Sequence, residues 1–227
     1  MSNNYNSRHQ SYCKFCNLDY HNDIINTVIL ESNNFKVIPA LGQFVEGYLL
    51  ILSKSHFYSI GGIPNSLADE LIAIKNEVDS LLKLHYSKPI FFEHGASSSG
   101  FKAGCCIDHA HIHAIPAKID LLPYLLTSYN LERINNINKM LNFGQRDIPY
   151  LFYENSEDEQ YICSIDINNE PPTQYLRKVL AQELNIVKYH DWRTYPFLEN
   201  IEKTILKLGN KKNKINYENN LSCSRNR

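Results

Sequence analysis

The chain is 227 residues long, and its 23 lysines and arginines against 24 acidic residues give a formal net charge of −1. This length suffices for one large domain or for a domain with an appended half, and the near-zero charge excludes a global attraction to nucleic acid or to acidic membranes. No basic start followed by an apolar run marks a secretory signal, and no apolar run is long enough to span a membrane. We therefore expect a cytoplasmic protein without nucleic-acid or membrane partners.

The first half predicts an antiparallel α+β sheet with a helix packed on one face. In chain order we expect a hairpin over residues 27–31 and 35–39, a strand over 47–53, a helix that opens at Pro64 and a strand over 89–93. The turn signal Ser32-Asn33-Asn34 predicts the hairpin. The run 47–53 is continuously apolar, so we expect it to be buried on both faces.

Residues 106–116, which follow a Ser/Gly-rich loop, read Cys-Ile-Asp-His-Ala-His-Ile-His-Ala-Ile-Pro. His109, His111 and His113 alternate with apolar residues, and this period of two predicts a strand with one buried face. All three imidazoles are then expected on the same side of one strand. Metal ligation and phosphate chemistry explain three titratable rings in that arrangement better than packing does.

The second half predicts further α+β structure without an internal repeat. We expect helices over residues 131–141, 173–184 and 198–208, and strands over 150–154 and 160–165. Arg177 is expected on a solvated helix face rather than at a phosphate, and residues 191–196 are expected to form an aromatic packing corner. Residues 1–12 predict a flexible N-terminus, and the Asn/Lys-rich residues 210–227 predict a disordered tail.

The pair Cys13-x-x-Cys16 is best interpreted as half of a zinc site, with two free reduced cysteines as the alternative. The six cysteines of this chain are unlike a disulfide framework, because the chain is neither small nor secreted-looking.

Three motifs in order resemble the histidine triad (HIT) family of nucleotide hydrolases and transferases, in its zinc-bearing subgroup. Residues 109–115 match the family pattern His-φ-His-φ-His-φ-φ, in which φ is apolar. Residues 47–56 resemble the family's buried strand that ends in Pro-Lys-x-His, with Ser53 in place of the proline, and Cys13-x-x-Cys16 is similar to the N-terminal cysteine pair. The resemblance implies a HIT-like domain over residues 13–120 and a C-terminal α+β extension over 121–209.

The resemblance also implies a catalytic mechanism. His111 would be the nucleophile that attacks an α-phosphate, and water would hydrolyse the resulting nucleotidyl-histidine. The backbone carbonyl of His109 would hold one ring nitrogen of His111 as N–H, and His113 would contact phosphate oxygens.

Substrate contacts are expected from Gly104, Cys105 and Cys106, because Cys106 falls where the family often has a Ser or Thr, although buried packing is the default for both cysteines. Glu93 or His94 could supply a general acid, or either could support the strand. The acidic residue with which many members bind ribose hydroxyls would fall near Ala40 and is absent, so the nucleoside preference is open.

For the metal, the resemblance implies that Cys13, Cys16, His56 and His109 hold a structural zinc, with His94 as a rival fourth ligand. A closed set of four ligands leaves no open position for water.

Three functions are compatible with these residues. The first is a phosphohydrolase that cleaves nucleotides or nucleotide conjugates. The second is a nucleotidyltransferase related to galactose-1-phosphate uridylyltransferases, which usually have Gln where this chain has His113. The third is a nucleotide-binding protein without significant turnover. A homodimer is possible in each case.

Overall fold

The computed structural model describes residues 13–17, 24–96, 109–166 and 170–209. The expected flexible N-terminus, the disordered tail, the Ser/Gly-rich loop and residues Gly104, Cys105 and Cys106 lie outside the described residues. Among the described residues, no helix is long and apolar enough to cross a membrane.

The strands of the described residues are β1 (Leu30–Glu31), β2 (Phe35–Pro39), β3 (Leu49–Ser53), β4 (Ile90–Gly95), β5 (His111–Ile115), β6 (Glu132–Ile134), β7 (Tyr150–Glu154) and β8 (Gln160–Ser164). The helices are α2 (Ala68–His85), α3 (Leu122–Ser128), α4 (Asn138–Gln145), α5 (Tyr175–Glu183) and α6 (Leu198–Leu208), with short 3₁₀ turns that include η3 (Ile60–Gly62).

All eight of these strands form one antiparallel sheet, in the order β1-β2-β3-β5-β4-β7-β8-β6. This confirms the predicted α+β class. The histidine strand β5 lies inside the sheet, between β3 and β4. Strand β7 of the second half pairs directly with β4, so the sheet continues across the boundary expected at residue 120.

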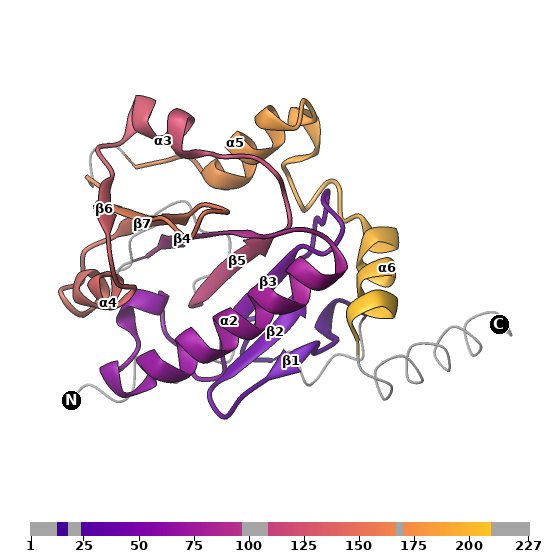
Figure 1. The fold of residues 1–227 in the computed structure, drawn as a ribbon, viewed down its shortest axis with the longest axis horizontal. Coiled ribbons are helices and arrows are strands. Elements are labelled where there is room, and N and C mark those ends of the chain that lie inside the picture. Colours follow the sequence, from indigo (N-terminus) through magenta and orange to yellow (C-terminus); the bar gives the residue numbers. More distant parts are fainter. Residues whose placement is uncertain (1–12, 18–23, 97–108, 167–169, 210–227) are drawn as a thin grey trace, which may run out of the picture.

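Helices cover both faces of the sheet. Figure 1 shows α2 running across β2 and β3, while α3 and α5 lie together at the top of the view. The α2-side core contains Leu49, Ile51, Phe91 and Ile112 from the sheet with Leu71, Ile74, Val78 and Leu82 from α2. The histidine-side core contains Leu50, Leu52, Phe92 and Ile115 from the sheet with Leu125 from α3 and Leu176, Val179 and Leu180 from α5. Successive residues of β3 thus enter opposite cores, as the continuous apolar run predicted.

The helix predicted over residues 131–141 is wrong in its first part. Residues Glu132–Ile134 form the edge strand β6, which pairs with β8, and helix α4 begins only at Asn138. The spacing of apolar residues in this short segment is compatible with a helix and with a strand, so tertiary pairing decides its secondary structure. Here the segment pairs with the edge of β8 and forms a strand. Helix α3, which has a proline in its first turn, was not predicted.

A buried ion pair joins the two halves on the α2 side of the sheet. The Lys75 ammonium on α2 lies 2.5 Å from the Glu154 carboxylate on β7 and 4.3 Å from the centre of the Phe91 ring. Gln160 donates a second hydrogen bond to Glu154, at 2.8 Å.

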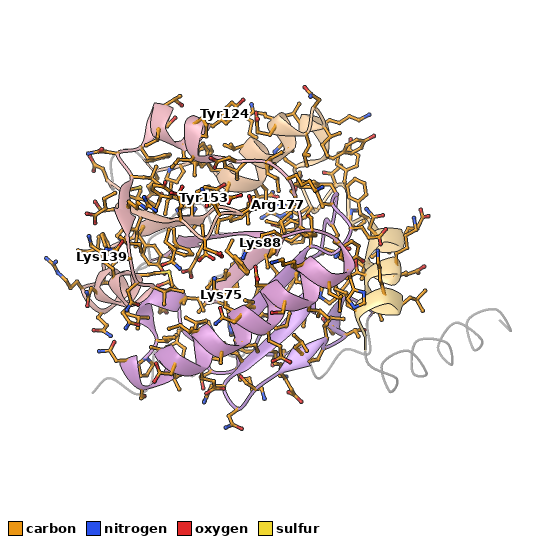
Figure 2. The ribbon with its side chains drawn as sticks, viewed as in Figure 1. Lys75, Lys88, Tyr124, Lys139, Tyr153 and Arg177 are labelled. Atoms are coloured by element: carbon orange, nitrogen blue, oxygen red, sulfur yellow. The ribbon has the colours of Figure 1, made fainter. Side chains whose placement is uncertain are left out.

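Figure 2 labels Lys75 on α2 and Arg177, which belongs to α5. The prediction that Arg177 lies on a solvated face is wrong, because only 5% of this residue is exposed.

Candidate active site and metal centre

His111 is the first residue of β5, and its ring is held by the backbone two residues earlier. The Nδ1–H group donates a hydrogen bond of 2.6 Å to the carbonyl oxygen of His109, which is the contact that the resemblance implies. Because the proton is fixed on Nδ1, the Nε2 atom keeps its lone pair. His109 itself lies in a bend just before the strand, so the expectation that one strand carries all three histidines is corrected.

His113 lies on the same face of β5 as His111, and their ring centres are 4.8 Å apart. Phe92 stacks on the His113 ring at 4.7 Å with an interplanar angle of 28°. The Nδ1 atom of His113 is 2.6 Å from the hydroxyl oxygen of Tyr48, the residue before β3. The ring is therefore held on one face by an aromatic ring and at one nitrogen by a phenol.

Burial keeps the histidines of this site uncharged near neutral pH. It lowers the pKa of His111, and it lowers the pKa of His113 well below the usual value, with the charges of His111 and Arg177 acting in the same direction. Burial also lowers the pKa of His109 to about 4, against the opposing effect of its hydrogen bond to Ser53. Neutral imidazole is the form that can attack phosphorus or bind a metal.

Cys13, Cys16, His56 and His109 form a compact cluster, in which all four ligand atoms lie within 4.8 Å of one another. The Sγ atom of Cys16 is 3.3 Å from Nδ1 of His56 and 3.5 Å from Nδ1 of His109, and Sγ of Cys13 is 3.4 Å from Nδ1 of His109. Ligands on a tetrahedral zinc ion lie roughly 3.3–3.8 Å apart. The cluster could therefore hold a metal ion, and two thiols with two imidazoles suit zinc.

Two further observations support a cation in this cluster. Burial, and then the neighbouring Cys13, raise the pKa of Cys16 to about 12, so that two thiolates would need a positive charge between them. The Nε2–H group of His109 donates to the carbonyl oxygen of Ser53 at 2.7 Å, which directs the Nδ1 lone pair toward the cysteines. The rival ligand His94 is not part of the cluster.

The cysteine pair also places an aromatic ring beside the nucleophile. The Phe15 ring lies 5.7 Å from the ring centres of both His109 and His111, in edge contacts. A cavity of about 390 Å³ opens next to it. Its lining residues are Phe15, Cys16, Glu31, Lys36, Leu52, Ser53 and Lys54. Leu52 is the cross-strand partner of His111, which does not itself line the cavity.

The two predicted residues of β4 face opposite sides of the sheet. Glu93 points into the α2-side core, where its carboxylate accepts a hydrogen bond of 2.7 Å from the Ile60 N–H group and contacts the hydroxyl of Tyr150. Its carboxylate thus faces away from the histidine face of the sheet, and its contacts favour the alternative that Glu93 supports the strand over the expected substrate contact. His94 is close enough to His111 to sense its charge, which acts together with burial to lower the pKa of His94 to about 4. Its Nε2 atom is buried and has no hydrogen-bond partner among the described residues.

Sequence reasoning missed three residues that shape this site, namely Phe15, Tyr48 and Phe92. Tyr48 is two residues before Leu50 and four before Leu52, both of which face the histidine side, so the period of the strand could have placed it there. Phe92 and Phe15 carry no such signal, because their positions depend on the pairing of β4 with β5 and on the fold of the cysteine pair.

The structure thus combines an antiparallel α+β sheet, a histidine pair on a central strand and a Cys/His cluster beside it. Among solved structures, the chain is similar to a HIT family hydrolase from Clostridium thermocellum, at 22% identity over 48% of this chain and 92% of that one, with a TM-score of 0.38. It is also similar to a zinc-bound histidine triad family protein from Mycobacterium smegmatis, at 20% identity over 61% and 94% of the two chains, with a TM-score of 0.39.

A third similar structure is a hypothetical histidine triad nucleotide-binding protein from Sulfolobus tokodaii, at 18% identity over 88% of this chain and 98% of that one, with a TM-score of 0.39. No family model matches the chain, and no curated protein does. The chain is thus structurally similar to histidine triad proteins. These identities and TM-scores are low, so the chemistry must come from the side chains of this chain.

Glu93 should make the stability of the fold depend on pH. Burial raises its pKa to about 8 in the folded protein, against about 4.3 in an unfolded chain. Between these values the folded state binds a proton that the unfolded state does not, so Glu93 lowers the free energy of unfolding as the pH rises from 5 to 8. We expect Glu93→Gln to flatten this decline in denaturant titrations. Glu157→Gln, at an exposed turn position, should keep the wild-type slope, and equal slopes for Glu93→Gln and wild type would contradict this account.

Proposed function

We propose that this protein is a hydrolase that cleaves a nucleotide or nucleotide conjugate at its α-phosphate, through a covalent intermediate on His111. The observation that carries the proposal is the 2.6 Å hydrogen bond from Nδ1–H of His111 to the His109 carbonyl. That bond leaves Nε2 as the free nitrogen of a buried, neutral imidazole. Neutral imidazole is both a good nucleophile and a good leaving group, which suits a two-step transfer to water.

In the first step, the Nε2 lone pair of His111 forms a bond to the α-phosphorus while the bond from that phosphorus to the leaving group breaks. The positive charge that develops on the ring is stabilised by the His109 carbonyl, which accepts the Nδ1–H hydrogen bond. His113 contacts a non-bridging phosphate oxygen, and the leaving group departs as an anion or takes the proton that it needs from solvent. In the second step, water attacks phosphorus, the electron pair of the P–N bond returns to Nε2, and one proton of the attacking water passes to solvent.

The cavity lined by Phe15 and Leu52, two residues that neighbour His111, supports a small-molecule ligand. Its volume of about 390 Å³ falls in the range of small-molecule sites. Phe15 and Leu52 offer it apolar surface, and Lys36 and Lys54 bring positive charge to its wall, where Lys54 is paired with Glu31 at 3.1 Å. In this cavity a nucleotide base would lie against the apolar side chains, and its phosphates would lie near the two lysines.

The Cys13, Cys16, His56 and His109 cluster would hold a zinc ion with a structural role. Four protein ligands leave no position for a metal-bound water. The metal would instead fix the backbone of His109, whose carbonyl orients the nucleophile, and would keep Phe15 against His111. The nucleophile and the phosphate contact remain side chains of this chain.

Replacing the nucleophile should abolish turnover without unfolding the protein. For His111→Asn we expect kcat to fall by at least about 10³-fold, with a melting temperature close to that of wild type. The measurement is a screen of dinucleoside polyphosphates and nucleoside phosphoramidates, with mass spectrometry to find a nucleotidyl adduct on His111 in the wild type. His85→Asn, on the last residue of α2, is the matched control and should remain active. Full activity of His111→Asn would rule out the mechanism.

Removing one metal ligand should release the zinc. We expect Cys16→Ser to bind less than one tenth of the wild-type zinc by elemental analysis and to melt at a lower temperature, because the cluster ties residues 13–16 to the sheet. Cys163→Ala, which changes a buried cysteine of β8 outside the cluster, should keep its zinc. Equal zinc content in the two variants would show that this cluster is not the metal site.

The acceptor distinguishes hydrolysis from nucleotidyl transfer. His113, where the uridylyltransferases usually have Gln, favours water as acceptor. Once the adduct on His111 has formed, we expect it to decay at the same rate with or without added sugar phosphates. A nucleotide sugar that accumulates when galactose 1-phosphate is added would instead identify a transferase, and an adduct that never forms despite tight nucleotide binding would identify a binding protein.

A further inference from the structure

We propose that Arg177, in the C-terminal half of the chain, is a positioning residue that acts through Tyr48 to fix the proton of His113 on Nε2. This inference rests on the proposed function in one respect, which is that His113 contacts a phosphate. The tautomer itself depends only on the contacts among Arg177, Tyr48 and His113, which bring α5 and the segment before β3 to the histidine strand.

Arg177 is a buried cation that forms hydrogen bonds to backbone carbonyls and lies against aromatic rings. Only 5% of the residue is exposed, and no acidic group among the described residues forms an ion pair with it. The guanidinium instead donates 2.6 Å and 3.1 Å hydrogen bonds to the carbonyl oxygens of Gly42 and His190. Its carbon lies 4.9 Å from the ring centre of Phe44 and 5.3 Å from that of Tyr48. The positive charge therefore acts on the neighbouring aromatic side chains of Phe44 and Tyr48.

The segment that carries Tyr48 is built to hold this arginine. Gly42 has a φ of +72°, and a Cβ atom there would lie 2.7 Å from Nη2 of Arg177 and 2.3 Å from Cβ of Trp192. The Gly42 N–H group donates to the carbonyl of Pro196 at 2.9 Å, so a second contact with the C-terminal half holds the same residue. Only glycine combines this conformation with such close contacts.

Helix α6 fixes the other end of the same segment. The Gly47 N–H group donates to the hydroxyl of Thr204 at 2.9 Å, and Thr204 in turn is hydrogen-bonded to the side chain of Gln43. Gln43 donates through its amide to the carbonyl of Tyr48 at 2.8 Å. The backbone of Tyr48 is therefore held from both sides before its side chain meets His113.

The charge of Arg177 decides the direction of the hydrogen bond between Tyr48 and His113. A nearby cation attracts the phenol oxygen and repels the phenol proton, so the proton points away from Arg177 and toward Nδ1 of His113, 2.6 Å from the oxygen. Burial raises the pKa of Tyr48 and keeps it a phenol, while the charge of Arg177 acts in the opposite direction and strengthens it as a donor. Nδ1 of His113 then accepts, and its proton resides on Nε2.

The two neighbouring rings thus carry their protons on opposite nitrogens. His111 has its proton on Nδ1 and offers a lone pair at Nε2, whereas His113 has its proton on Nε2 and offers an N–H donor. A neutral donor suits the phosphate contact, because burial lowers the pKa of His113 and prevents it from acting as an imidazolium. Stacking on Phe92 holds the ring in the plane that Tyr48 selects.

The test is the ring-nitrogen ¹⁵N NMR spectrum of the zinc-loaded, full-length protein at pH 7.5, recorded without substrate. We expect the His113 signals, assigned with His113→Asn, to show a protonated Nε2 and an unprotonated Nδ1. Tyr48→Phe should give mixed tautomers. Arg177→Met should weaken the preference, and Arg177→Lys should restore part of it because the charge returns. Lys178→Met, at the exposed neighbouring position on α5, should leave the spectrum unchanged.

In the hydrolysis assay, Tyr48→Phe should lower kcat by about 10- to 100-fold, as the loss of an oriented hydrogen bond to a charged group predicts, with little change in KM. A protonated Nδ1 on His113 in the wild type, or an unchanged tautomer in Tyr48→Phe, would overturn the proposal. The NMR spectrum needs no turnover, so the two proposals can fail separately. If His113 shows the predicted tautomer but the His111→Asn variant stays active, the proposed function is refuted and the positioning role is retained.

Discussion

One hydrogen bond, from Nδ1–H of His111 to the carbonyl oxygen of His109, gives the site its chemistry. The bond fixes the proton of the His111 imidazole on Nδ1, so the lone pair lies on Nε2. The side chain of His109 is itself held, because its Nδ1 atom lies near Cys13 and Cys16 and its Nε2–H group donates to the Ser53 carbonyl. The Cys/His cluster and His111 are therefore mechanically linked, because His109 belongs to the cluster and supplies the carbonyl that orients the His111 ring.

The second half of the chain contributes to this unit from several directions. Strand β7 extends the sheet beyond β4, and helices α3 and α5 close the histidine-side core. Helix α6 fixes the segment before β3 through Thr204. Arg177 places its positive charge next to Tyr48. The second half of the chain, which carries no recognisable motif, therefore contacts the site through side chains that are far from the histidines in sequence.

Most of the sheet could be predicted from local pattern. Alternation placed β5, the continuous apolar run placed β3, and α6 agrees with the prediction residue for residue. The residues 131–141 could not be assigned, because the pairing of Ile134 with Gln160 decides for a strand. The family resemblance grouped Cys13, Cys16, His56 and His109, and the structure places these four residues in one cluster that could hold a metal ion. The burial of Arg177 had no local signal, because its partners are the carbonyls of Gly42 and His190 and the rings of Phe44 and Tyr48.

The pairing of β4 with β7 determines what a shortened chain would look like. A polypeptide ending at residue 120 would expose the whole outer edge of β4, including the backbone of Phe91 and Glu93 that now bonds to Glu154 and Phe152. It would also uncover Leu50, Leu52 and Phe92, which the second-half helices now shield from water. Bare strand edges beside apolar surface promote association between chains. The motifs span only residues 13–117. This part of the chain nevertheless depends on the second half to pair its strand edge and to cover its apolar surface, so it is not a separate domain.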